Sequence, residues 1–178
     1  MLSKDLNEIL TSELFSITGG LFAGIMLAVF FEKIFQFPGL LILIPGFLEM
    51  SGALGGSLSS RISSGLFLGV IKPHFGRNPI LKSNIIATIV LFIMVSFFLG
   101  VFAFFANKFL FGINNVRIIP VALIAGIVSM IITQLTAIAT LWLFKKGHDP
   151  NNFMGPVITT LGDIVSVISF MIAIVLVT

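Results

Sequence analysis

The stretch GPVITTLGDIVSVISFMIAIVLV, residues 155–177, is almost entirely apolar and is long enough to cross a lipid bilayer. A transmembrane helix needs about 20 such residues to span about 30 Å of hydrocarbon. One carboxylate, Asp163, lies well inside the stretch. An aspartate near the centre of a membrane helix costs about 2.5–3.5 kcal/mol on translocon scales. The stretch therefore predicts a membrane helix whose aspartate has a function.

The composition of the whole chain indicates the same class of protein. Of the 178 residues, 57% are hydrophobic and 10% are charged, whereas charged residues make up about a quarter of typical soluble domains. There are no cysteines, which excludes disulfides, thiolate zinc sites and thiol chemistry. The first 13 residues are polar and no signal-peptide cleavage site follows them. The sequence predicts an all-α, multi-pass protein of the cell membrane.

Five apolar runs are long enough to be membrane spans, at about residues 14–31, 38–60, 83–106, 118–144 and 153–177. The second run contains Pro38, Pro45 and several glycines, so we expect it to be kinked or broken, or to continue past Arg61. We therefore divide the chain into a short cytoplasmic segment, residues 1–13, and a five-helix transmembrane transport domain, residues 14–178.

The basic residues predict the orientation of these spans, because cytoplasmic loops carry an excess of Lys and Arg. The larger set would lie on one side of the membrane and comprises Lys4, Arg61, Lys72, Arg77, Lys82, Lys145 and Lys146. The smaller set would lie on the other side and comprises Lys33, Lys108 and Arg117. We expect the N-terminus inside and the C-terminus outside. An odd number of spans without an internal repeat favours a homodimer.

Helical geometry places polar residues on defined faces of the predicted spans. At about 100° per residue, three oxygen-bearing side chains fall within about 60° of Asp163, namely Thr159, Thr160 and Ser166. One face of the second span carries Glu49, Gly52, Ala53, Gly56, Ser60 and Ser63. Apart from the glutamate it is made of small residues, and Gly52 and Gly56 have the GxxxG spacing of close helix packing.

Other polar features have less specific interpretations. The fourth span aligns Ser129, Thr133, Thr136 and Thr140, which we interpret as interhelical hydrogen bonding rather than ion ligation. The GxxxG pair Gly20 and Gly24 in the first span is typical of helix packing. Glu49 could serve the site or form a structural ion pair with a Lys or Arg. We expect His148, between Lys146 and Asp149, to be solvated.

The partner of Asp163 is predicted to be a bound cation or a proton, because the other spans carry no Lys or Arg at a comparable depth. Oxygen donors suit Mg²⁺, Ca²⁺ or Mn²⁺. Mg²⁺ is commonly held by one or two carboxylates and keeps several waters, so two copies of Asp163 at a dimer axis would suffice for a pore site. The candidate metal ligands are Asp163, Thr159, Thr160, Glu49, Gly52 and Gly56. We predict no organic cofactor and no nucleic-acid partner.

Two segments resemble the integral-membrane domain of MgtE-type magnesium channels and of the related solute carrier family 41. The first is IPGFLEMSGALGGSLSSRISSG, residues 44–65, which is similar to the family's proline, glycine-rich turn and Ser-Arg-Leu/Ile-Ser run. It matches at Pro45, Gly52, Leu54, Ser60, Arg61 and Ser63. The second is GHDPNNFMGPVITTLGD, residues 147–163, which resembles the family's DP…GP…TT..D signature. It matches at Asp149, Pro150, Gly155, Pro156, Thr159, Thr160 and Asp163.

The resemblance implies a homodimer of five-helix protomers that transports divalent cations, above all Mg²⁺. The second and fifth spans of each protomer would line one central pore, with Asp163 as the central cation ligand. The short N-terminal segment has no counterpart of the family's magnesium-sensing cytoplasmic region, so we expect no gating by such a region. Ala53 stands where the family commonly has asparagine, so backbone carbonyls would have to serve at this turn. Glu49 lies a turn or more before the acidic position of the solute carrier relatives.

Two other classes of function, an intramembrane aspartyl protease and a membrane scaffold, are alternatives to transport. Gly162-Asp163 is similar to part of the Gly-x-Gly-Asp motif of intramembrane aspartyl proteases, but that chemistry needs two carboxylates that share a proton. Position 160 is Thr and no second span supplies an Asp, which argues against a protease. A non-transporting membrane scaffold that packs through its GxxxG faces stays open, and in a scaffold Asp163→Asn would change nothing. The sequence does not separate a channel from an ion-coupled carrier, nor Mg²⁺ from Mn²⁺, Co²⁺ or Ni²⁺.

Overall fold

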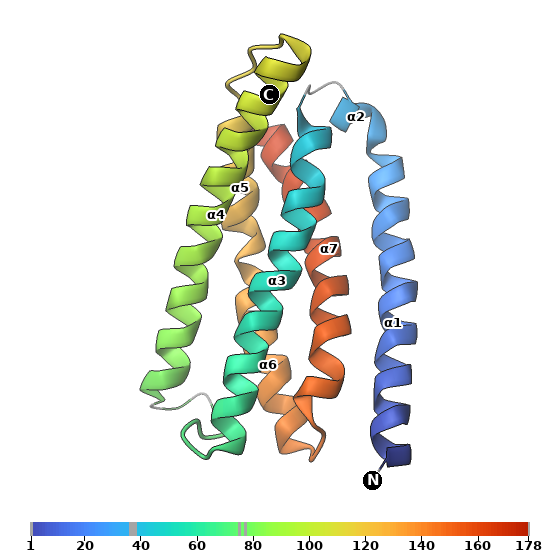
Figure 1. Ribbon diagram of the computed structural model, residues 1–178, viewed down its shortest axis with the longest axis vertical. Coiled ribbons are helices and arrows are strands. Elements are labelled where there is room, and N and C mark those ends of the chain that lie inside the picture. The colour runs from blue at the N-terminus through green and yellow to red at the C-terminus, as the bar shows by residue number, and fades with distance from the viewer. Residues whose placement is uncertain (1, 36–38, 75, 77, 178) are drawn as a thin grey trace.

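A computed structural model describes residues 2–35, 39–74, 76 and 78–177 (Figure 1). Pro38 and Arg77, which entered the span and charge predictions, lie outside the described residues, as does the side chain of Lys4. The described part of the chain is helical and contains no strand. Its elements are α1 (Leu2–Val29), α2 (Phe31–Phe35), α3 (Leu40–Phe67), α4 (Pro79–Phe111), α5 (Ile118–Ser129), α6 (Ile131–Lys145) and α7 (Pro150–Val177).

Five segments are long and apolar enough to span a membrane, which confirms the predicted number. They are Asp5–Val29, Leu40–Phe67, Pro79–Phe111, Ile118–Lys145 and Pro150–Val177. The fourth consists of α5 and α6, which meet at a turn at Met130. Helix α1 begins at Leu2, so residues 2–13, predicted to precede the first span, are helical and continuous with it.

The second span is one continuous helix, so the break that was among the expectations does not occur. Helix α3 keeps Pro45 in its interior and runs past Arg61 to Phe67. Gly39 precedes it with φ of 94°, a conformation that suits glycine and that turns the chain into the helix. Extension past Arg61, one of the alternatives that the sequence left open, is therefore confirmed.

Helices α3, α4, α5, α6 and α7 form a bundle, and α1 lies along one side of it against α7 (Figure 1). The centre of the bundle contains the fully buried Phe47, Phe92 and Phe170. The rings of Phe47 and Phe170 meet edge to face, with centroids 4.7 Å apart. Phenylalanine therefore fills the space between α3, α4 and α7, while many other apolar side chains face outward, as a lipid-exposed surface requires.

Hydroxyl groups join the helices inside the bundle. Ser129 donates to Ser169 at 3.0 Å between their Oγ atoms, and Ser59 and Thr140 lie 3.0 Å apart. For these two members of the fourth span, the predicted interhelical hydrogen bonding is confirmed. Thr133 and Thr136 are also buried, but their Oγ1 atoms have no hydrogen-bond partner among the described residues.

The connections fall into two groups at opposite ends of the bundle. Figure 1 shows the N-terminus, the α3–α4 connection and the α6–α7 connection at one end, and α2 and the α4–α5 connection at the other. The described connections at the first end carry Lys72 and Lys146, two members of the larger basic set. The spatial grouping agrees with the predicted pattern of charges, and the orientation in the membrane stays a prediction.

Candidate cation site

The candidate site lies where α3 and α7 run side by side (Figure 1). Two glycines allow this close approach. A Cβ atom placed on Gly162 would lie 3.1 Å from the Cβ of Ser51 and 3.3 Å from the backbone N of Gly52. A Cβ atom on Gly52 would lie 3.5 Å from Oγ1 of Thr159. Small residues at both positions therefore bring the polar residues of the two helices to one place.

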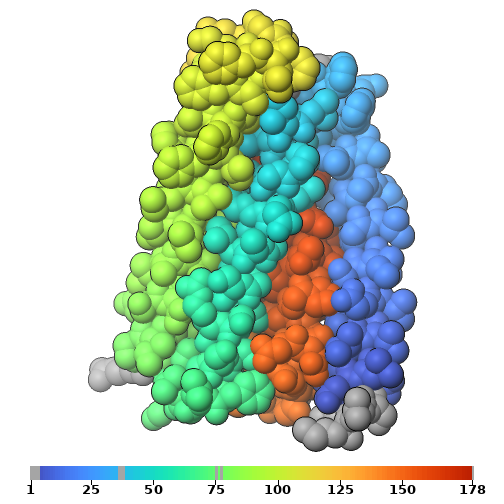
Figure 2. Space-filling view, in the orientation of Figure 1, coloured from blue at the N-terminus to red at the C-terminus, as the bar shows by residue number. Residues whose placement is uncertain are grey.

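The two helices form a cleft of about 560 Å³ in which the acidic residues of both spans meet. Its lining consists of Pro45, Leu48, Glu49, Gly52, Ala53, Thr159 and Asp163. The side chain of Glu49 is exposed, whereas Asp163 is half-buried. Figure 2 shows this face of the molecule, where α7 reaches the surface between α3 and α1. Four of the six predicted ligands, namely Asp163, Thr159, Glu49 and Gly52, thus share one cleft.

Among the described residues, the lining of the cleft contains two carboxylates and no cationic side chain. Among the described residues, neither Glu49 nor Asp163 forms an ion pair or accepts a hydrogen bond. The structural ion pair considered for Glu49 is therefore not formed in the described part of the chain. Because two like charges in one site disfavour each other's charged forms, a cation that both carboxylates face would stabilise this arrangement.

Thr159 adds a neutral oxygen to the same cleft. Its hydroxyl donates to the backbone oxygen of Gly155 at 3.1 Å, one turn earlier in α7. With its proton engaged there, the lone pairs of the hydroxyl oxygen are available to a cation or to a water that a cation carries.

Thr160, also predicted as a ligand, does not belong to the lining of the cleft that contains Asp163. It is 1% exposed and packs against α1, where its hydroxyl lies 3.0 Å from Oγ of Ser16 and donates to the Ser16 backbone oxygen at 3.3 Å. Helical geometry explains the difference, since Thr160 lies on one flank of Asp163 and Thr159 on the other. The first flank faces α1 and the second faces α3.

Ser166 and Gly56 also lie outside the lining of the cleft. Ser166 is buried and its Oγ lies 2.7 Å from Oγ of Ser51, so it joins α7 to α3. Gly56 is one turn beyond Gly52 on α3, and a Cβ atom there would meet no atom within 4 Å. The single oxygen-bearing face predicted for α7 is therefore divided between the cleft and the two neighbouring helices.

Three lining residues, Pro45, Leu48 and Ala53, were not predicted as members of the site. The sequence did contain an indication that Pro45 belongs to a site. A proline has no backbone N–H, so the carbonyl four residues earlier in the helix loses its hydrogen-bond donor. In a membrane such a carbonyl is tolerated where protein or a water-filled cavity satisfies it. Pro45 and Glu49 are also one turn apart on α3, so both belong to the same face.

The donor set suits a hydrated ion rather than a closed metal cage. Among the described residues there is no group of three or more His, Cys, Asp or Glu side chains that could hold a metal ion. A pair of carboxylates with a hydroxyl leaves most coordination positions to water, which fits Mg²⁺ because that ion gives up its waters reluctantly.

Comparison with known proteins identifies the family of this membrane chain. A family model described as MgtE, divalent cation transporter, matches residues 44–173, which is most of the chain. The match includes α3 from Ile44 onward and every residue that lines the cleft formed with α7. Comparisons with curated proteins and with solved structures gave no match. The chain therefore belongs to the MgtE family of divalent cation transporters, and it is a multi-pass integral membrane protein.

Proposed function

We propose that this protein carries Mg²⁺ across the membrane through a pore at a homodimer axis, with Asp163 of each protomer as the central cation ligand. The observation that carries the proposal is the cleft that Asp163 of α7 and Glu49 of α3 both line, with no cationic side chain in its described lining. Membership of a divalent-cation transporter family gives the class of substrate. The cleft gives it a place to bind.

The size of the cleft supports a hydrated magnesium ion as the occupant. Water takes about 30 Å³ per molecule in the liquid, so the six waters of an octahedral magnesium ion occupy about 180 Å³. The cleft has about 560 Å³, which leaves room for the ion with most of its waters. Asp163 then acts on the ion through direct contact or through one of these waters, and complete dehydration is not required.

A second protomer is part of the proposal because α3 and α7 supply the whole described lining of the cleft and leave it open to the outside of the single chain. It is formed by α3 and α7, and its rim residues Glu49 and Ala53 are exposed in the single chain. The residues that continue the rim along α3, Gly56 and Ser57, are also small. A copy related by twofold symmetry would place a second Asp163 opposite the first and close the pore. Two carboxylates would then balance the charge of one Mg²⁺.

Magnesium flux into liposomes tests this function. Purified protein is reconstituted around a magnesium indicator, and the initial rate of Mg²⁺ entry is compared for wild type, Asp163→Asn and Asp163→Ala. Glu32→Gln is the matched control, because it removes an exposed carboxylate of α2 outside the cleft. We expect flux in wild type and the control and its loss in both Asp163 variants.

Three other outcomes would contradict parts of the proposal. Absence of flux in wild type under both a voltage and an ion gradient would exclude Mg²⁺ as the transported ion. Unchanged flux in both Asp163 variants would move the central site elsewhere. Equal loss in Glu32→Gln would show that the effect is not specific to the cleft. If none of the proteins conducts any divalent cation, the scaffold alternative is favoured.

A further inference from the structure

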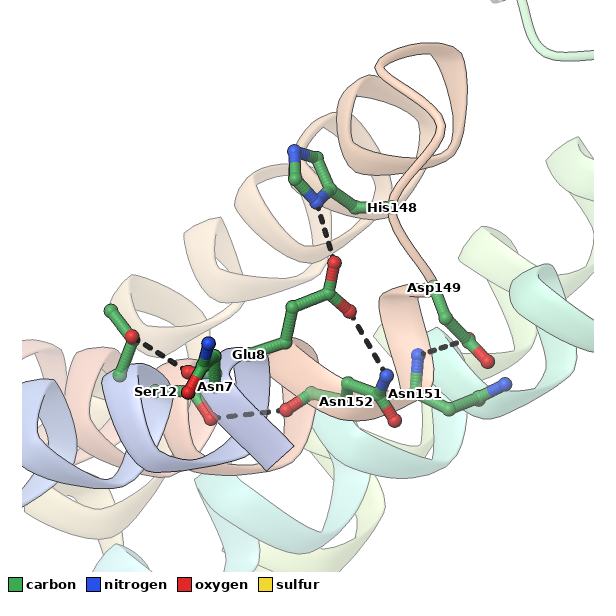
Figure 3. Close-up of polar contacts among 8 residues, drawn as sticks. Asn7, Glu8, Ser12, His148, Asp149, Asn151 and Asn152 are labelled. Carbon is green, nitrogen blue, oxygen red and sulfur yellow. Dashed lines mark hydrogen bonds and ion pairs between the residues drawn. The ribbon is translucent and has the colours of Figure 1, made fainter. Parts of the chain in front are cut away.

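A cluster of polar side chains ties the start of α1 to the connection between α6 and α7 (Figure 3). Oε1 of Glu8 lies 2.8 Å from Nδ1 of His148. The side-chain amide of Asn152 donates to Oε2 of Glu8 at 3.0 Å, and the hydroxyl of Ser12 donates to the Asn152 backbone oxygen at 3.0 Å. We call these four residues the α1 latch. The sequence prediction of a solvated His148 missed the contact with Glu8.

The α1 latch adds polar contacts to a helix whose other attachment to the bundle is its packing along α7. The helix packs mainly against α7, and most of its large apolar side chains face outward. Farther along α1, Ser16 contacts Thr160 of α7 through the hydrogen bonds described above. Asn152 belongs to the first turn of α7, the helix that carries Asp163. The α1 latch therefore joins the outer helix directly to the start of the helix with the candidate cation ligand.

Among the described contacts of Glu8, His148 is the partner whose charge can change near neutral pH. A cavity of about 440 Å³ adjoins it, lined by Asp5, Glu8, Phe67, Phe144, Gly147, His148, Asp149 and Asn152. The titratable groups facing Glu8 in this lining are therefore Asp5 on its own helix and His148 and Asp149 on the α6–α7 connection. Helices α3 and α6 contribute phenylalanines, and no Lys or Arg belongs to the described lining. Glu8 is 8% exposed, so its charge is sensitive to the state of the imidazole.

We propose that Glu8 and His148 make the α1 latch proton-sensitive, so that it holds α1 on α7 firmly when His148 is charged and loosely when His148 is neutral. Histidine changes its charge between about pH 5 and 8. A hydrogen bond between two charged groups is about twice as strong as a neutral one. The His148 side chain is 41% exposed, so protons from solution reach it. Detachment of the first turns of α1 should therefore increase as the pH rises through this range.

Thiol labelling measures this detachment, because the chain has no cysteine and an introduced one is its only thiol. Ser12 is 2% exposed and Thr11, its neighbour on the same helix, is exposed. The rate at which a small charged methanethiosulfonate labels Ser12→Cys, divided by the rate for Thr11→Cys, reports the detached fraction. The division also removes the effect of pH on the reactivity of the thiol. We expect the ratio to rise about fivefold between about pH 6 and pH 8.5, the range in which the charged bond becomes a neutral one.

The two histidines of the chain supply a variant and its matched control. In His148→Gln, which can still donate a hydrogen bond but carries no charge, the ratio should be high at both pH values. In His74→Gln, which alters the α3–α4 connection, the rise with pH should persist. A ratio that does not change with pH, or that still rises in His148→Gln, would overturn the proposal.

A distance measurement gives an independent readout that does not depend on Ser12. Spin labels on Thr11→Cys of α1 and Asn151→Cys of α7, both at exposed positions, should give a narrow distance distribution at about pH 6. We expect the distribution to broaden towards longer distances at about pH 8.5, and to be broad at both pH values with His148→Gln. An unchanged narrow distribution in all cases would exclude the α1 latch as a pH-dependent device. Neither readout requires ion transport, so its outcome is independent of the proposed function.

Discussion

Gly52 of α3 lies directly against Thr159 of α7, so that a Cβ atom on the glycine would come 3.5 Å from the threonine Oγ1 and 3.7 Å from its Cα. This contact fixes the separation of the two helices beside the cleft. Glu49 lies one turn before Gly52, and Asp163 lies one turn after Thr159. The spacing between the two carboxylates is therefore set by a residue that has no side chain.

Substitutions of Gly52 should show whether Mg²⁺ flux depends on open space in the cleft, because they add side-chain volume without removing a side-chain ligand. In Gly52→Ala the added Cβ makes ordinary contacts, so we expect Mg²⁺ flux to stay within about twofold of wild type. In Gly52→Leu the longer side chain must enter the cleft or separate the helices, so we expect flux to fall at least about tenfold. Flux measurements on the pair test this. Equal loss of flux in both variants would instead indicate that position 52 tolerates no side chain of any size.

Two glycines on α7 should respond oppositely to alanine. In Gly162→Ala the new Cβ would lie 3.1–3.4 Å from three atoms, two of which belong to the α3 backbone, so α3 must move. We expect a net destabilisation of about 1–2 kcal/mol after the helix propensity of alanine is counted. In Gly155→Ala the Cβ meets nothing within 4 Å, so stability should stay the same or rise. Thermal unfolding in detergent compares the two, and equal Tm values would contradict the close approach at Gly162.

Thr159 and Thr160 are neighbours in the sequence but should have separable effects. Thr160→Val removes the hydrogen bonds to Ser16, so we expect a loss of about 0.6–1.7 kcal/mol of stability with little change in the Mg²⁺ concentration at half-maximal flux. Thr159→Val removes an oxygen from the cleft, so we expect that concentration to rise with little change in stability. Measurement of both properties for both variants gives the test. The reverse assignment would contradict the division of the α7 face between α1 and the cleft.

Helical periodicity predicted the polar face of α7 but not its division. A helical wheel gives the directions of Thr159, Thr160 and Ser166, whereas the identity of the helix in each direction follows from tertiary packing. For the same reason the contact between Glu8 and His148 was missed, because it depends on α1 lying beside the start of α7. The five spans were predictable, because hydrophobic length alone decides which segments can cross the membrane.

The sequence of the second span did not determine whether its helix is continuous, kinked or broken. Proline and glycine in a membrane helix are compatible with a continuous helix, a kink or a break, and neighbouring helices decide between them. In the structure α3 stays helical through Pro45 and past Arg61. The turn at Met130 between α5 and α6 was likewise not predicted, since the sequence around it, IVSMIIT, has no proline or glycine to mark it.

Glu49 should assist the cation without being essential. Its side chain is exposed at the rim of the cleft, and exposed charge pairs contribute about 1 kcal/mol or less. We expect Glu49→Gln to raise the Mg²⁺ concentration at half-maximal flux about two- to fivefold, and less so at high ionic strength because salt screens exposed charges. Glu13→Gln, which removes an exposed carboxylate of α1, is the control. Complete loss of flux in Glu49→Gln would make Glu49 a central ligand alongside Asp163.

The homodimer can be tested with cysteines on the α3 rim. A disulfide needs Cα atoms about 4.4–6.8 Å apart, so single cysteines at Ala53, Gly56 and Ser57 sample the proposed dimer axis. We expect at least one of them to cross-link two protomers in the membrane under mild oxidation. Phe102→Cys is the control, since this residue is 70% exposed on α4, outside the cleft. Cross-linking through Phe102 alone would place the interface elsewhere.

If Asp163 binds the transported cation, a bound divalent ion should be found beside it. Mn²⁺ prefers the same oxygen ligands as Mg²⁺ and gives an anomalous X-ray signal. Crystals of wild type and Asp163→Asn, each grown with Mn²⁺, would show where the ion binds. We expect an anomalous peak beside Asp163 in the cleft of wild type and its absence in Asp163→Asn. A wild-type peak away from the cleft, or one beside residue 163 that persists in the asparagine variant, would contradict it.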